Sequence, residues 1–240
     1  MSERFYLPER FDRPELTLSG TEAHHLAHVL RIGVGAPVTL FDGEGTEAVA
    51  EVVAVGKREV RLQLRSTSRP PEPTATPITL AVAPPKGDRF RWLVEKATEL
   101  GVARLVPLIT RRSVVDPREG KLDKLRQTII AACKQSGRCR LMELTDPLRF
   151  DALLSNAAEQ SARLLLLHPQ GEAPGTMPVA GSDRLTLLIG PEGGFAGDEV
   201  DAAAAHGAQL ISLGPTILRT EPAAIAAAAV ATQWLAAGRP

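Results

Sequence analysis

The sequence predicts an α/β protein that begins with a small all-β domain, and three observations support this. Residues 1–66 contain β-branched or alternating runs separated by glycine turns. Residues 69–77 contain four prolines, which are typical of a stiff, extended linker. After residue 77, apolar runs alternate with helical patterns, as in a mainly parallel sheet between helices. We therefore expect an all-β domain at residues 1–70, a linker at 71–77 and an α/β domain at 78–240.

The first domain is expected to be a small barrel or sandwich. Its strands are predicted at residues 38–41, 47–55 and 59–64, with glycine turns between them. A short helix is predicted at residues 22–30, with Ser19 or Thr21 as its N-cap.

The second domain is expected to alternate strand and helix. Strands are predicted at residues 78–83, 104–109, 163–167, 185–189 and 209–213. Helices are predicted at residues 89–100, 121–134, 151–159, 198–206 and 222–236. The strand at 185–189 lacks polar alternation, so we expect it to be covered on both faces.

Composition narrows the class of protein. The formal net charge is zero, but residues 84–150 carry 15 basic and 8 acidic side chains, so this block either binds a polyanion or has solvated basic helix faces. The chain has two cysteines, too few for a disulfide framework or a metal cage, and His24 and His28 lack acidic partners at ligand spacing. No apolar run is long enough to span a bilayer, and the N-terminus has no apolar signal region. We expect a cytoplasmic protein without a metal or a membrane.

Two loops near the C-terminus each follow a strand-like apolar run. Residues 190–195 (Gly-Pro-Glu-Gly-Gly-Phe) lack the spacing of a dinucleotide fingerprint, but their glycines allow a ligand close to the backbone. The second loop contains Ile217 and Leu218, which are expected to wall a pocket for a flat ring. Loops at the carboxyl ends of parallel strands form a ligand crevice.

The second loop leads into the last helix. Pro222 suits the first helical position, with Glu221 or Thr220 as the cap. Arg219 opposes the helix dipole there, so it is expected to face an anion or a reacting group. Residues 86–89 (Lys-Gly-Asp-Arg) begin another helix and suit a phosphate. Together these features predict an enzyme that modifies nucleic acid.

These motifs resemble the S-adenosylmethionine-dependent RNA methyltransferases of the SPOUT superfamily, and within it the ribosomal RNA small subunit methyltransferase E family. The resemblance spans nearly the whole chain, at residues 4–5, 28–31, 86–89, 96–101, 112–113, 135–138, 188–195 and 213–221. The sequence departs from the family pattern at Lys134, Thr216 and Pro222.

The resemblance implies a PUA-like β-barrel that holds RNA, followed by a SPOUT domain with a C-terminal trefoil knot. It implies a homodimer that methylates N3 of a uridine in 16S ribosomal RNA, either free or in the small ribosomal subunit, with S-adenosyl-L-methionine as the cofactor. The implied cofactor-binding residues are Leu167, His168, Ile189, Gly190, Glu192, Gly194, Leu213, Gly214, Ile217, Leu218 and Thr220.

Methylation of uridine N3 requires loss of a weakly acidic proton, which suggests a base and a group that stabilises the resulting anion. Glu221 is the first candidate base and Glu192 the second, although Glu221 could simply cap the helix. Arg219 or Arg138 could stabilise the oxyanion of the ring. The candidate RNA-binding residues are Arg31, Lys86, Arg89, Arg112 and Arg138. For Arg31, a structural pairing with Glu22 is an equal alternative.

Two other functions remain open from the sequence. The first is a non-catalytic RNA-binding or ribosome-assembly factor, which would have no affinity for the cofactor. The second is an ordinary doubly wound nucleotide enzyme, which fits poorly because Pro84 and Pro85 follow the first predicted strand of the second domain.

Overall fold

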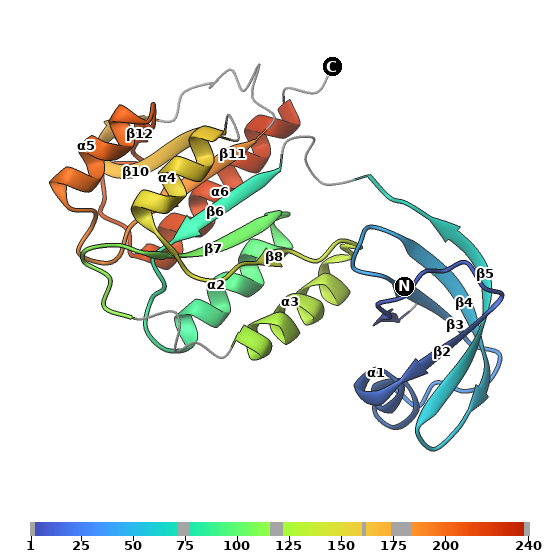
Figure 1. The fold of residues 1–240 in the computed structure, drawn as a ribbon. Helices are drawn as coiled ribbons and strands as arrows, with labels where there is room; N and C mark the ends of the chain where they lie inside the picture. The colour runs from blue at the N-terminus through green and yellow to red at the C-terminus, as the bar shows by residue number, and fades with distance from the viewer. Residues whose placement is uncertain (1–2, 72–76, 116–121, 160–161, 174–183, 238–240) are drawn as a thin grey trace. The chain divides into compact units, whose positions relative to one another are not determined.

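The computed structural model describes residues 3–71, 77–115, 122–159, 162–173 and 184–237 (Figure 1). They belong to two compact units, one of residues 1–72 with 130–141 and the other of residues 73–129 with 142–240. The segment 130–141 thus groups with the N-terminal unit, which its position in the sequence did not indicate. The predicted linker lies mostly outside the described residues, at 72–76.

The first unit is built on one five-stranded sheet in the order β1-β3-β4-β5-β2. The strands are β1 (Arg4–Tyr6), β2 (Glu15–Ser19), β3 (Pro37–Phe41), β4 (Glu47–Val55) and β5 (Glu59–Ser68). β1 runs parallel to β3, and the other neighbours are antiparallel. Strands β3, β4 and β5 were predicted, whereas β1 and β2 are short strands that the sequence analysis missed.

The helical segment of this unit differs from the single helix predicted at 22–30. A short α1 (Gly20–His24) continues into a π-helical turn, η1 (His25–Val29). Ser19, one of the two predicted candidates, is the N-cap residue, but its side chain makes no capping hydrogen bond. Ala23 and Leu26 are buried in the core of the sheet and hold this segment in place.

Ion pairs attach the segment 130–141 to the first unit. Lys134 Nζ lies 2.9 Å from Glu22 Oε2 and 5.2 Å from the centre of the Phe5 ring. Arg4 pairs with Glu47 and donates to the carbonyl oxygens at positions 137 and 138, at 3.2 and 3.3 Å. Among the described residues Glu22 pairs with Lys134, and no ion pair between Glu22 and Arg31 is present.

The second unit contains a parallel sheet in the order β12-β10-β11-β6-β7-β8, with β9 paired to β7 (Figure 1). The strands are β6 (Ile78–Val82), β7 (Arg104–Ile109), β8 (Glu143–Leu144), β9 (Leu148–Arg149), β10 (Arg163–Glu172), β11 (Leu185–Ile189) and β12 (Gln209–Ile211). The predicted parallel α/β sheet is confirmed. β8 and β9 were missed because two residues are too few for a periodic pattern.

Four helices of the described residues belong wholly to this unit: α2 (Asp88–Glu99), α4 (Phe150–Glu159), α5 (Gly197–Ala205) and α6 (Thr220–Ala237). A fifth helix, α3 (Leu122–Ser136), is divided between the two units at residue 130. α6 packs against α2, β6 and β11, while α4 packs against α5. All five residues of β11 are buried, so this strand is covered on both faces as predicted. In the described part of the chain, no helix is both long and apolar enough to cross a membrane.

Strand order places three loops at the same edge of the sheet. β10 lies between β11 and β12, and all three are parallel, so their carboxyl ends are neighbours. These ends carry the three segments that the resemblance assigned to the cofactor. β10 extends five residues beyond its predicted end at Leu167, and its pairing with β12 shifts between Leu167 and Glu172, both of which face Ile211. The trefoil knot stays a prediction.

Candidate functional site

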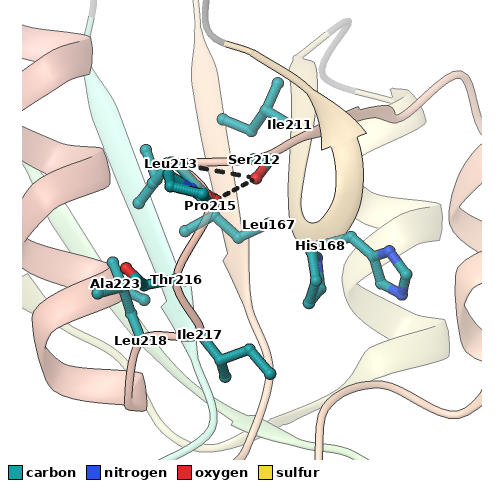
Figure 2. A pocket seen from close by; sticks show the side chains of 12 residues that line it. Leu167, His168, Ile211, Ser212, Leu213, Pro215, Thr216, Ile217, Leu218 and Ala223 are labelled. Atoms are coloured by element: carbon teal, nitrogen blue, oxygen red, sulfur yellow. Dashed lines mark hydrogen bonds between the residues drawn. The ribbon is translucent and has the colours of Figure 1, made fainter.

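A pocket opens where β10 and β12 end (Figure 2). Its walls come from residues 167–169 of β10, the last residue of β12, the loop after β12 and the first turn of α6. The lining residues are Leu167, His168, Pro169, Ile211, Ser212, Leu213, Gly214, Pro215, Thr216, Ile217, Leu218 and Ala223. Six of the predicted cofactor residues are among them: Leu167, His168, Leu213, Gly214, Ile217 and Leu218. The predominantly apolar lining suits a flat ring with a few polar groups at its edge.

The loop after β12 is shaped by a hydrogen-bonded turn and carries an exposed apolar pair. Ser212 Oγ donates to the Gly214 carbonyl at 3.1 Å, which folds the chain back over the end of the strand (Figure 2). Ile217 is 88% exposed and Leu218 39% exposed. The sequence predicts that these two side chains line a pocket. They do line it, but from an open side, so a ligand would bury apolar surface that now faces solvent.

The loop after β11 is a tight turn. The Gly194 amide donates to the Pro191 carbonyl at 2.8 Å, and Gly194 has φ +69°, a conformation that favours glycine. A Cβ at Gly190 would lie 3.1 Å from the Phe195 ring, so a larger residue would require the ring to shift by a few tenths of an ångström. This loop does not line the pocket directly.

The start of α6 connects the loop after β11 to the loop after β12. Thr220 Oγ1 donates to the Gly190 carbonyl at 3.2 Å, and Thr220 is buried. The predicted capping role of Thr220 is therefore wrong: α6 begins at Thr220 itself, and Pro222 is its third residue, not its first. Ile189, Gly190, Glu192, Gly194 and Thr220, the other predicted cofactor residues, form this adjoining group.

Arg89 joins two of the predicted site carboxylates. Its Nη1 lies 2.8 Å from Glu192 Oε1 and 3.2 Å from Glu221 Oε1. The hydrogen bond with Glu192, assisted by Glu221, raises the pKa of the Arg89 guanidinium, so this side chain stays charged. Glu192 is exposed, whereas Glu221 is buried. The structure thus brings together both candidate bases and a residue predicted to bind RNA.

The predicted anion-facing residue Arg219 precedes α6 and is exposed. Its side chain makes no hydrogen bond or ion pair with any residue that the structure describes. Its guanidinium is therefore available to an incoming anion or reacting group.

The other predicted RNA-binding residues differ in exposure and in hydrogen bonding. Arg112 Nη1 donates to the carbonyls of Gly193 and Phe195, at 2.8 and 3.4 Å, so this side chain braces the loop after β11. Arg138 is 8% exposed, which leaves little of it open to a phosphate. Lys86 and Arg31 are exposed, and neither side chain pairs with a described residue.

Glu199 is a structural residue of the site for which the sequence predicts only a place in the first turn of a helix. Its buried carboxylate accepts hydrogen bonds from the backbone amides of Ala196, at 2.8 Å, and Arg111, at 2.9 Å. It thereby links the start of α5 to the turn after β7. An acidic residue in the first turn of a helix is a common signal for backbone capping, and it could have been used here.

Within the described ranges, no group of three histidine, cysteine or acidic residues lies close enough to hold a metal ion. Cys133 and Cys139 are both buried, and burial raises the pKa of the Cys139 thiol.

Two family models match the chain. A model described as the RNA methyltransferase domain covers residues 71–232, and one described as the RNA methyltransferase PUA domain covers residues 18–65. These matches assign the α/β unit to the RNA methyltransferases and the small β unit to their PUA domains.

Relatives of known name narrow this class. Ribosomal RNA small subunit methyltransferase E of Mycobacterium tuberculosis is 34% identical, with 88% of this chain and 83% of that protein covered. The same-named Bacillus subtilis protein is 30% identical, with 88% and 87% covered. The chain belongs to the ribosomal RNA small subunit methyltransferase E family.

Solved structures are also similar. A putative methyltransferase from Legionella pneumophila, in complex with its cofactor S-adenosylmethionine, has a TM-score of 0.88 and 35% identity, with 99% of this chain and 98% of that chain covered. The Neisseria gonorrhoeae ribosomal RNA small subunit methyltransferase E, bound to S-adenosylmethionine, has a TM-score of 0.89 and 28% identity, with 97% and 98% covered.

Proposed function

We propose that this protein transfers a methyl group from S-adenosylmethionine to N3 of a uridine in 16S ribosomal RNA. The observation that carries the proposal is the open apolar pocket at the ends of β10 and β12, in a chain of the ribosomal RNA small subunit methyltransferase E family. Two similar structures hold S-adenosylmethionine. The homodimer and the knot implied by the resemblance belong to the same proposal.

The pocket residues fit the cofactor. Leu167, Leu213 and Leu218 offer apolar contacts for an adenine ring, and the loop after β12 offers backbone groups for its edge. Gly190 and Gly194 allow the neighbouring loop to approach the rest of the molecule closely. When bound, S-adenosylmethionine supplies an electrophilic methyl group on a positively charged sulfur.

The chain must hold the uracil ring with N3 toward that methyl group and remove the N3 proton. In this proposal Glu221 accepts the N3 proton as the N–CH₃ bond forms and the methyl–sulfur bond breaks, which would leave a neutral thioether; Glu192 is the second candidate base. Arg219 stabilises the negative charge that develops on the ring oxygens, because its exposed guanidinium has no partner among the described residues. Arg138 is a weaker candidate for this role because it is buried.

The RNA backbone would contact exposed basic side chains. Lys86 and Arg31 are the predicted RNA residues that are both exposed and unpaired within the described segments, so we propose these two as phosphate contacts. Arg112 would then act on RNA indirectly, by bracing the loop after β11.

The proposed reaction is tested by incubating the purified protein with S-adenosylmethionine and either unmodified 16S RNA or small subunits that lack the modification. In at least one substrate, mass mapping of nuclease fragments should find one added methyl group at a single uridine, and chromatography of the digested nucleosides against an N3-methyluridine standard should place it on N3. A non-catalytic RNA-binding factor would leave both substrates unmodified. A methyl group on another base or on a ribose would overturn the assignment to N3.

A further inference from the structure

We propose that Arg89 is a positioning residue that holds Glu221 for proton transfer, and that it is not a phosphate contact. The inference rests on the proposed function, and it replaces the RNA-binding role that the sequence suggested for Arg89. Two observations support it: the ion pairs of Arg89 with Glu192 and Glu221, and the buried Glu221 oxygen that has no hydrogen-bond partner among the described residues.

The Glu221 carboxylate is buried, yet only one of its oxygens is satisfied. Oε1 lies 3.2 Å from Arg89 Nη1, and the Glu221 side chain is 6% exposed. Oε2 is buried and has no hydrogen-bond partner in the described part of the chain. A buried carboxylate oxygen without a donor costs free energy, so it calls for a physical reason, and a catalytic role is one such reason. The N3–H of a uracil ring is a donor of the required kind.

The Arg89 guanidinium is held by the Glu192 carboxylate and by the Lys86 carbonyl. Its Nη1 is shared with Glu192 Oε1 at 2.8 Å, and its Nε donates to the Lys86 carbonyl at 3.3 Å. Gly87, with φ +67°, is the N-cap of α2 and turns the chain so that Arg89 falls in the first helical turn. The planar guanidinium is therefore anchored, and it fixes the rotation of the Glu221 carboxylate.

The neighbouring backbone adds a second constraint on Glu221. Thr220, directly before it, is tied to the Gly190 carbonyl. The backbone and the side chain of Glu221 are thus both held near the loop after β11, and Oε2 is the carboxylate oxygen that has no partner among the described residues. A proton acceptor must be held in hydrogen-bond geometry, and a small misplacement of a reacting group can reduce the rate roughly 100-fold.

The two roles for Arg89 predict different kinetics. A phosphate contact would contribute about 0.7–0.9 of a unit to the salt dependence of RNA binding. A positioning residue would change the rate of methyl transfer at saturating RNA and leave that salt dependence unchanged. Arg91 provides a matched control, since it lies on the same helix, is exposed and has only a 3.8 Å contact with Asp88.

The test compares Arg89→Met, Arg89→Lys and Arg91→Met. We expect Arg89→Met to lower the single-turnover rate at saturating RNA by roughly 10- to 100-fold, with RNA affinity and salt slope equal to those of Arg91→Met. Arg89→Lys should restore part of the rate, because lysine keeps the charge but cannot reproduce the planar fork. Melting temperatures of all three variants establish that they fold.

A double-mutant cycle shows whether Arg89 acts through Glu221. In a Glu221→Gln background, adding Arg89→Met should cause no further loss of rate. Equal losses in both backgrounds would overturn the proposal, as would a lost unit of salt slope with an unchanged rate. If Glu221→Gln alone leaves the rate unchanged, the proposal also fails while the methyltransferase assignment stands. Absence of methylation by the wild-type protein would instead be a failure of the proposed function.

Discussion

Replacing Glu221 with glutamine is expected to slow single-turnover methylation by about 100- to 10,000-fold, the usual contribution of a general base. Glutamine keeps the size of the side chain but cannot accept the N3 proton. The variant should still bind S-adenosylmethionine, because Glu221 does not line the pocket between β10 and α6. Rapid-quench measurements with saturating RNA and cofactor give the rate, and calorimetry gives the cofactor affinity.

Glu192→Gln is the informative comparison. Glu192 shares the same guanidinium but is exposed, so its loss should not reproduce the defect in the proton-transfer step. An unchanged rate for Glu221→Gln, with a slow Glu192→Gln, would transfer the role of base to Glu192. Slow rates in both variants with lost cofactor binding would mean that the carboxylates hold the cofactor.

Gly171→Ala is expected to disrupt the pocket by forcing β10 away from Ile211, which lines it. A Cβ at this position would lie 2.5 Å from the Ile211 carbonyl carbon and 2.6 Å from its nitrogen, far inside normal contact distance. Because the obstruction is backbone, β10 and β12 must separate where the Ser212 amide donates to the Glu172 carbonyl. Overpacking of this kind costs about 1–3 kcal/mol. We expect a lower melting temperature and weaker binding of S-adenosylmethionine.

Gly197→Ala is the control for this substitution. Gly197 begins α5, and a Cβ there would have no heavy atom within 4 Å. It should leave both melting temperature and cofactor affinity unchanged. The account of the β10–β12 contact would be contradicted if Gly171→Ala behaved like Gly197→Ala.

The sequence predicted the parallel sheet because its strands are long apolar runs between helical patterns. Residues 104–109 and 185–189 were located to the residue. The extension of β10 to Glu172 was missed because residues 168–172 (His-Pro-Gln-Gly-Glu) are polar and contain proline and glycine, which usually end a strand. There the pairing with Ile211 overrides local propensity.

The sequence predicted the loops of the site, but not the contacts that join them to distant residues. Glycine and proline signals located the loops after β11 and β12, and the apolar pair Ile217 and Leu218 indicated a pocket. Local patterns cannot reveal that Arg89 reaches Glu192 and Glu221, because those residues lie more than 100 positions away in the chain. For the same reason the pairing of Lys134 with Glu22 could not be inferred.

A crystal structure of the protein with S-adenosylmethionine would test most directly whether residues 167–169 of β10 and the loop after β12 form the cofactor site. The account predicts the adenine ring between Leu167, Leu213 and Leu218, with Ile217 losing its exposure to solvent. A cofactor bound elsewhere on the chain, with this pocket unchanged, would contradict it.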